Sequence, residues 1–148
     1  MRKTVTTLLL ALPLALAGIT AAQADNASAE GRWRQIDPDT HRAKSIVEIS
    51  RTGNGNLNGR IIELLNPSRP NPTCDKCSDD RKGKPITGME IIRNMRADGA
   101  NKWSGGSILK PDEGKVYKSK MELIENGSKL QVSGCIAFLC KSQVWERM

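Results

Sequence analysis

The sequence has few aromatic residues and a single histidine. Tryptophan, tyrosine and phenylalanine together make up 3% of the 148 residues, and His41 is the only histidine. Basic residues outnumber acidic ones, but they are scattered along the chain and form no block of like charge. Proteins that bind nucleic acids use aromatic side chains that stack on bases, or continuous basic surfaces. The sequence therefore argues against nucleic acid as a partner.

The motifs of common catalytic and metal sites are also missing. A Ser-His-Asp triad would have to use His41, and no Gly-x-Ser-x-Gly nucleophile elbow is present. No second histidine could complete a metal site, and no Asp-x-Asp-x-Asp-Gly calcium loop occurs. His41 follows an Asp-Pro turn sequence, where we expect it to be solvated. The sequence therefore predicts a protein without enzymatic activity and without a metal or cofactor.

The first residues have the pattern of a secretory signal peptide. Arg2 and Lys3 precede an apolar stretch, residues 5–19, and Ala22-Gln23-Ala24 then forms a small-x-small cleavage pattern. The apolar stretch is too short for a transmembrane helix, and no cysteine lies at the cleavage site for lipid attachment. We expect residues 1–24 to be removed on export, which leaves no transmembrane segment.

The remaining residues, 25–148, have the length of a single domain. They carry 21 basic and 16 acidic side chains, a net charge of +5. A solvated surface accounts for scattered charges of this kind. The alternative explanation of the positive charge is weak attraction to anionic components of the cell envelope.

The four cysteines form two close pairs, Cys74 with Cys77 and Cys135 with Cys140. Exported proteins enter an oxidising compartment in which disulfides persist, so the local pairings Cys74–Cys77 and Cys135–Cys140 are favoured. A zinc site would need all four thiolates, which an oxidising compartment disfavours. A thiol-disulfide catalyst normally carries Cys-x-x-Cys at a helix N-terminus, whereas this motif follows a proline-rich loop. A structural disulfide is the favoured interpretation, with the other two left open.

Short stretches rich in β-branched residues alternate with turn sequences. The clearest alternation is residues 115–124, in which Tyr117, Ser119, Met121 and Leu123 share one face. A long polar loop, residues 66–87, contains four prolines, and no convincing amphipathic helix interrupts the pattern. The expected strands are 31–36, 43–50, 57–65, 88–95 (a short helix being the alternative), 102–109, 115–124, 129–136 and 141–148.

About eight strands joined mostly by short links predict an all-β protein, an antiparallel up-and-down eight-stranded barrel, with a sandwich as the alternative. In such a barrel the odd-to-even links lie at one end and the chain termini at the other. The first end would hold the 66–87 loop, both cysteine pairs and His41. A barrel of this size is either filled by side chains or holds one small ligand.

Four motifs in a fixed order carry a family resemblance. Gly31-Arg32-Trp33 is the Gly-x-Trp that opens lipocalin and other calycin barrels. It is followed by Cys-x-x-Cys, by GGSILKPDEGKVY (residues 105–117) and by SQVWERM (residues 142–148). In this order, residues 30–148 resemble the domain-of-unknown-function family 2147, small secreted bacterial proteins with a calycin-like fold. The resemblance implies a barrel exported to the bacterial periplasm or medium, and almost nothing about activity.

The resemblance also suggests a structural role for the two termini. In calycin barrels a basic side chain from near the C-terminus covers the Gly-x-Trp indole at the closed end, and the matching positions here are Trp33 and Arg147. Pairing of the first and last strands would place these residues together independently, within reach of a cation–π contact. We therefore expect them to plug the end opposite the cysteines.

The last hairpin has a predicted register. In residues 129–136, Leu130, Val132 and Gly134 alternate inward, so Cys135 faces outward. A disulfide across the hairpin requires Cys140 to face outward as well. Every second residue after it, including Trp145 and Arg147, would then point inward, in agreement with the expected Trp33 contact.

Function is predicted from fold analogy alone. We expect a monomeric, exported barrel that binds a small apolar or amphipathic molecule. The alternatives are a structural or interaction module of the envelope with a filled barrel, and a thiol-disulfide or metal-binding factor at the cysteine end. The inward residues predicted to bind the ligand are Trp33, Tyr117, Met121, Leu130, Val132 and Trp145.

Overall fold

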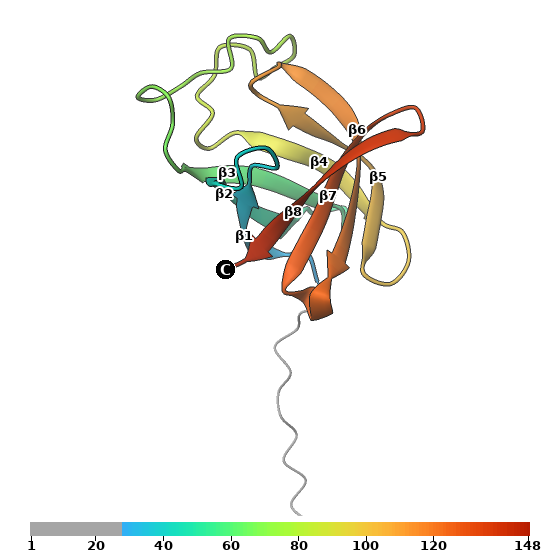
Figure 1. Cartoon of the computed structure of the whole chain (residues 1–148). Coiled ribbons are helices and arrows are strands. Elements are labelled where there is room, and N and C mark those ends of the chain that lie inside the picture. Colours follow the sequence, from blue (N-terminus) through green and yellow to red (C-terminus); the bar gives the residue numbers. More distant parts are fainter. Residues whose placement is uncertain (1–27) are drawn as a thin grey trace, which may run out of the picture.

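Eight antiparallel strands close into a barrel in the structure, a computed structural model that describes residues 28–148 (Figure 1). Each strand pairs with the next in sequence, and β1 also pairs with β8. The up-and-down barrel predicted from sequence is confirmed, while the predicted signal peptide, residues 1–24, lies outside the described residues. The strands are β1 (Gly31–Ile36), β2 (Ala43–Arg51), β3 (Leu57–Leu64), β4 (Glu90–Ala97), β5 (Lys102–Lys110), β6 (Lys115–Ile124), β7 (Lys129–Ile136) and β8 (Leu139–Arg147), and a short 3-10 helix, η1 (Glu125–Gly127), joins β6 to β7.

Alternation along the strands separates the barrel interior from its surface. On β6, Ser119, Met121 and Leu123 are buried, while Lys118 and Lys120, which flank Ser119, are exposed. The period of two places every second side chain on the same face of the sheet, so these buried residues line the interior. The segment with an uncertain prediction, residues 88–95, is largely covered by the strand β4.

The links between strands gather at two ends of the barrel. The β1–β2, β3–β4, β5–β6 and β7–β8 links lie at one end, which we call the open end, together with His41 and both cysteine pairs. The N-terminal side of β1, the C-terminal side of β8 and η1 lie at the other, the closed end (Figure 1). Among residues 28–148, no helix is long and apolar enough to cross a membrane.

The Gly105-Gly106 pair lies at a bulge in β5, where this strand pairs with β6. The register of β5 on β6 shifts between Trp103 and Gly106, and Gly105 has a left-handed φ of 74°. A Cβ on Gly106 would overlap the carbonyl oxygen of Arg93 and would lie 2.6 Å from the Met95 Sδ atom. The absence of a side chain at Gly106 therefore allows β5 to pass close to the β4 backbone.

Candidate functional site

Trp33 and Arg147 meet at the closed end of the barrel. Trp33 is fully buried, and its indole Nε1 donates a hydrogen bond of 2.8 Å to the carbonyl oxygen of Ala29. The strand register pairs Trp33 with Arg147, and the Arg147 Cζ atom lies 4.3 Å from the centre of the indole ring. At this distance the guanidinium stacks on the indole and closes the end of the barrel.

Arg147 also ties three chain segments together. It donates hydrogen bonds to the carbonyl oxygens of Gly127 (2.6 Å), Glu30 (3.2 Å) and Ser28 (2.8 Å). Its burial lowers the pKa of the guanidinium below its usual range, although an arginine remains charged at neutral pH. One side chain thus holds the segment before β1 and the η1 turn against the indole.

Replacing Arg147 with alanine should lower the free energy of unfolding by about 2–3 kcal/mol, because the stacking contact and hydrogen bonds from a charged donor are lost together. Arg147→Lys should cost about half as much, since it keeps the charge but not the planar fork. Urea unfolding measures both. Arg34→Ala is the matched control, because its ion pair with Glu146 is exposed, and it should cost under about 1 kcal/mol. Equal losses in Arg147→Ala and Arg34→Ala would contradict the structural role.

Five of the six predicted ligand-binding residues lie deep in the barrel core. Their side chains are at most 2% exposed and pack into one apolar cluster: Trp33, Met121, Leu130, Val132 and Trp145. Tyr117 differs, because it is only partly buried near the start of β6 and its hydroxyl donates a 2.5 Å hydrogen bond to Glu113 in the β5–β6 turn. The structure thus places five residues in the filled part of the barrel and one at its rim. Their role in ligand binding stays a prediction.

The interior toward the open end is polar. Gln35, Ser45 and Gln143 occupy interior positions, alternating with the buried Trp33, Val47 and Trp145 on the same strands. Ser45 Oγ donates to Gln35 Oε1 (2.6 Å), and Gln35 Nε2 donates to Gln143 Oε1 (3.2 Å). Both glutamines are partly exposed. Solvent therefore reaches a hydrogen-bonded chain that crosses β2, β1 and β8.

Two further polar groups inside the barrel are buried without a partner. Ser119 Oγ and Trp145 Nε1 form no hydrogen bond with any described residue. Ser119 lies between Gly106 on β5 and Gly134 on β7, so the interior carries small residues on three adjacent strands. The sequence placed Ser119 and Gln143 on inward faces together with Met121 and Trp145, but it did not single out Gln35, Ser45, Ser119 or Gln143 as site residues. The signal was present, because each polar residue alternates in step with inward apolar ones.

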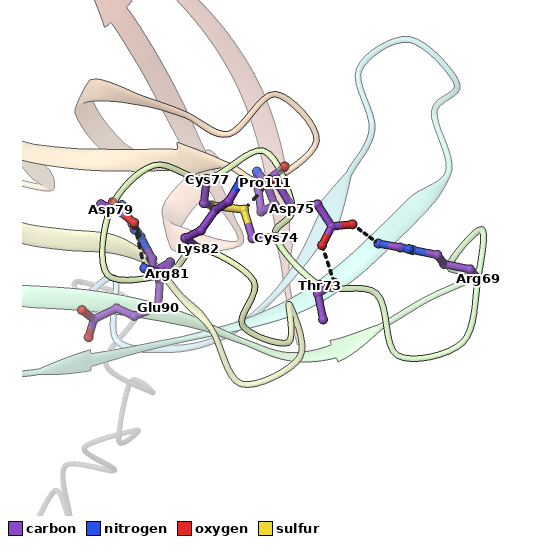
Figure 2. The surroundings of a disulfide bond; sticks show 10 residues. All are labelled: Arg69, Thr73, Cys74, Asp75, Cys77, Asp79, Arg81, Lys82, Glu90 and Pro111. Carbon is purple, nitrogen blue, oxygen red and sulfur yellow. Dashed lines mark hydrogen bonds and ion pairs between the residues drawn. A yellow bond between two sulfur atoms is a disulfide. The ribbon is translucent and has the colours of Figure 1, made fainter.

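A long loop, residues 65–89, covers part of the open end. Its Cys74–Cys77 disulfide is buried, with Cys74 at 0% and Cys77 at 2% exposure, and it joins the apolar core cluster (Figure 2). Cys74 Sγ lies 3.7 Å from the carbonyl oxygen of Pro111 in the β5–β6 turn. Gly114 in that turn has no room for a side chain against the backbone of Lys76. The disulfide closes a short turn within the loop, this turn packs against the β5–β6 turn, and the sulfurs are shielded from solvent.

Ion pairs hold the remainder of this loop. Asp75 accepts hydrogen bonds from Arg69 and Thr73, and the buried Arg81 pairs with Asp79, as Figure 2 shows. Arg81 Nη1 also donates to the carbonyl oxygen of Glu90 on β4 (2.9 Å). These contacts give the loop, despite its length, a fixed position on the barrel.

Two carboxyl groups at the rim have strongly lowered pKa values. Hydrogen bonds from Arg93 Nη1 and Nη2, at 2.9 and 2.8 Å, lower the pKa of Asp80 from 3.8 to about 2. Hydrogen bonds from Lys110 and then Tyr117 lower the pKa of Glu113 from 4.5 to about 2. The charged form of each carboxyl is therefore the one that the folded protein favours.

These shifts predict an acid-dependent loss of stability. A carboxyl whose pKa is lower in the folded state stabilises the fold above its unfolded pKa and loses this effect as pH falls through the folded value. The midpoint temperature of thermal unfolding should therefore decrease as the pH is lowered from about 4.5 to about 2. The double variant Asp80→Asn, Glu113→Gln should show a smaller fall over that range. Asp39→Asn, which removes a turn carboxyl without an ion pair in the described chain, is the control. An unchanged pH profile in the double variant would contradict the assignment.

The Cys135–Cys140 disulfide joins directly paired residues across the β7–β8 hairpin. Trp145 is buried and Gln143 and Arg147 are partly buried, whereas Ser142, Val144 and Glu146, which alternate with them, are exposed. The parity of β8 is therefore the one expected from sequence, including the 38% exposure of Val144. Cys135 is only 5% exposed, although it is out of step with the inward Leu130 and Val132. All four cysteines of the chain are in disulfides.

Two surface hollows lie outside the barrel interior. One, about 460 Å³, lies beside Gly105 and Gly106 on β5 and includes Arg93, Arg96 and Asn54 in its lining. The other, about 330 Å³, lies between the long loop and β4 and includes Arg60 and Lys84. Both are open to solvent. They contain none of the six residues predicted to bind a ligand.

Comparison with known proteins places the chain in a family. The family profile described as "Uncharacterized protein conserved in bacteria (DUF2147)" matches residues 31–147. The chain belongs to the DUF2147 family. A solved structure with a similar fold is described as "Protein HP1028 from the human pathogen Helicobacter pylori belongs to the lipocalin family". The two sequences are 16% identical, the aligned region covers 82% of this chain and 84% of the other, and the TM-score is 0.71.

The likeness to that lipocalin concerns the fold of this DUF2147 protein, since the sequence identity is low. No curated protein matches the chain at a significant level. The family match and the likeness in fold agree with the resemblance drawn from Gly31-Arg32-Trp33 and the C-terminal motif.

Proposed function

We propose that this DUF2147 protein is an exported, non-enzymatic binding protein that takes one small amphipathic molecule into the open end of its barrel. The observation that carries the proposal is the division of the interior into an apolar, filled part and a polar part reached by solvent. Gln35, Ser45 and Gln143 form the polar part. The lipocalin-like fold supports the same interpretation.

The unpartnered polar groups support an amphipathic rather than a purely apolar ligand. A buried polar group without a hydrogen bond costs about 1–3 kcal/mol. A ligand carrying a hydroxyl, amide or carboxylate could supply partners to Ser119 or Trp145, which have none in the described chain. Its apolar part would contact Tyr117 at the rim and Met121 and Val132 below it. Trp33 and Leu130 would support the floor of the site from the closed end.

Native mass spectrometry of the gently purified protein tests the proposal directly. A bound molecule would add mass to the protein. The purified protein should also bind a fluorescent amphiphile such as anilinonaphthalene sulfonate. Gln143→Met should weaken amphiphile binding about three- to tenfold, because one hydrogen-bonding group is removed at similar volume. Gln131→Met, at an outward position on β7, is the matched control. Absence of both added mass and amphiphile binding would overturn the proposal.

A filled barrel that acts as a structural or interaction module is the second candidate. The full burial of Trp33, Leu130 and Trp145 in one cluster favours it. The same two measurements separate the candidates, since a filled barrel retains no ligand. Thiol-disulfide exchange at the Cys-x-x-Cys motif receives no support, because exchange requires an accessible sulfur and both Cys74 and Cys77 are buried.

Export and oligomeric state belong to the proposal and are tested separately. Protein recovered from the periplasm or medium should have the mass of residues 25–148 with two disulfides. Sedimentation should show a monomer. A mass that includes residues 1–24 would contradict cleavage after Ala24.

A further inference from the structure

The tip of the β7–β8 hairpin exposes a cluster of large apolar side chains. Ile136, Phe138 and Leu139 are 67%, 90% and 70% exposed. Ile136 and Leu139 pair directly across the hairpin, and only Ala137 and Phe138 connect the two strands. Single exposed apolar residues are ordinary on protein surfaces, but three within four residues form a patch that requires an explanation.

The hairpin presents this tip in a fixed form. The Cys135–Cys140 disulfide crosses the hairpin next to the Ile136–Leu139 pair. The hairpin projects away from the barrel wall, at the upper right of Figure 1, so no other strand covers its tip. Ordering a flexible loop on binding costs conformational entropy, and the disulfide reduces this cost in advance. The tip is therefore built to keep apolar side chains in solvent.

Lysines without an ion-pair partner among residues 28–148 lie near the tip of the hairpin. In the strand register, Lys118 lies opposite Cys135 and Lys141 lies opposite Gly134, so both are next to the disulfide. These lysines, and Lys115 and Lys120 on β6, are exposed and form no ion pair within residues 28–148. The acidic residue Glu122, also on β6, lies nearer the closed end and forms an ion pair with Lys102. The apolar tip is thus bordered by positive charge.

We propose that the β7–β8 hairpin docks the protein on an anionic lipid bilayer. Ile136, Phe138 and Leu139 would insert between lipid headgroups, while Lys118 and Lys141 contact phosphate groups. A bilayer interface accepts a small apolar wedge with a basic border. A stable protein partner would need roughly 800 Å² of surface on each side, which a two-residue turn does not provide. Docking through this hairpin would turn the open end of the barrel toward the membrane.

Vesicle co-sedimentation of the purified protein tests this proposal. The protein should bind vesicles of phosphatidylcholine with phosphatidylglycerol and bind phosphatidylcholine alone more weakly. Phe138→Asp should weaken binding about tenfold or more, because the largest apolar contact is lost. The double variant Lys118→Gln, Lys141→Gln should weaken it by a similar factor and reduce its salt dependence. Met148→Ser and Lys102→Gln, which change similar side chains near the closed end, should bind as the unaltered protein does.

A tryptophan at the tip provides a direct probe of insertion. In Phe138→Trp, emission should shift to the blue on anionic vesicles and be quenched by brominated acyl chains, while the three native tryptophans are at most 8% exposed. Thermal unfolding should be unchanged in Phe138→Asp, because Phe138 is 90% exposed. Failure to bind vesicles, or binding that Phe138→Asp leaves unchanged, would overturn the proposal. A protein dimer lost in Phe138→Asp would also overturn it, because a second copy would then cover the tip.

Discussion

Trp33→Ala should lower the free energy of unfolding by about 3–5 kcal/mol, a large part of the stability of a domain of this size. Trp33 is fully buried, fills the closed end and receives the stacked guanidinium of Arg147. Alanine would remove the apolar contacts, leave a cavity and deprive the Ala29 carbonyl of its donor. Chemical denaturation monitored by circular dichroism measures the loss.

A matched pair of tryptophan substitutions separates the hydrogen bond from the packing. Trp33 and Trp145 are both fully buried, but only the Trp33 Nε1 atom has a partner in the described chain. Trp33→Phe should therefore cost about 1 kcal/mol more than Trp145→Phe. Equal costs would show that the bond to Ala29 contributes little. If a ligand accepts a bond from Trp145, Trp145→Phe should weaken ligand binding instead.

Gly106→Ala should destabilise the barrel by about 3 kcal/mol, because overpacking against backbone cannot be relieved by a side-chain rotation. The added Cβ would overlap the Arg93 carbonyl and lie 2.8 Å from the carbonyl carbon of Asn94. Strands β4 and β5 would have to separate at the bulge. Thermal and urea unfolding both report the effect.

Gly53→Ala is the control for this substitution. Gly53 has open space around its Cα atom and no left-handed φ, so alanine there should change the free energy of unfolding by less than about 1 kcal/mol, in the stabilising direction. A small effect at Gly106 would mean that the two strands approach less closely than the structure shows.

The sequence by itself determined the barrel and its closure. Alternation of buried and exposed residues along β6 is a local property, since successive side chains of a strand point to opposite faces. Closure through β1 and β8 followed from the up-and-down order, and this order also placed Trp33 beside Arg147. The parity of Cys135 and Cys140 followed from the same alternation.

Only the tertiary structure decided what the interior and the long loop contain. The chain Ser45–Gln35–Gln143 joins residues from three strands, and its members are distant in sequence. Whether Cys74 and Cys77 face solvent depended on how residues 65–89 fold onto the β5–β6 turn, which no local pattern specifies. Burial and hydrogen bonding between such segments arise from packing in three dimensions. A repeating pattern along one strand therefore predicts a face, but not the groups that meet it from elsewhere.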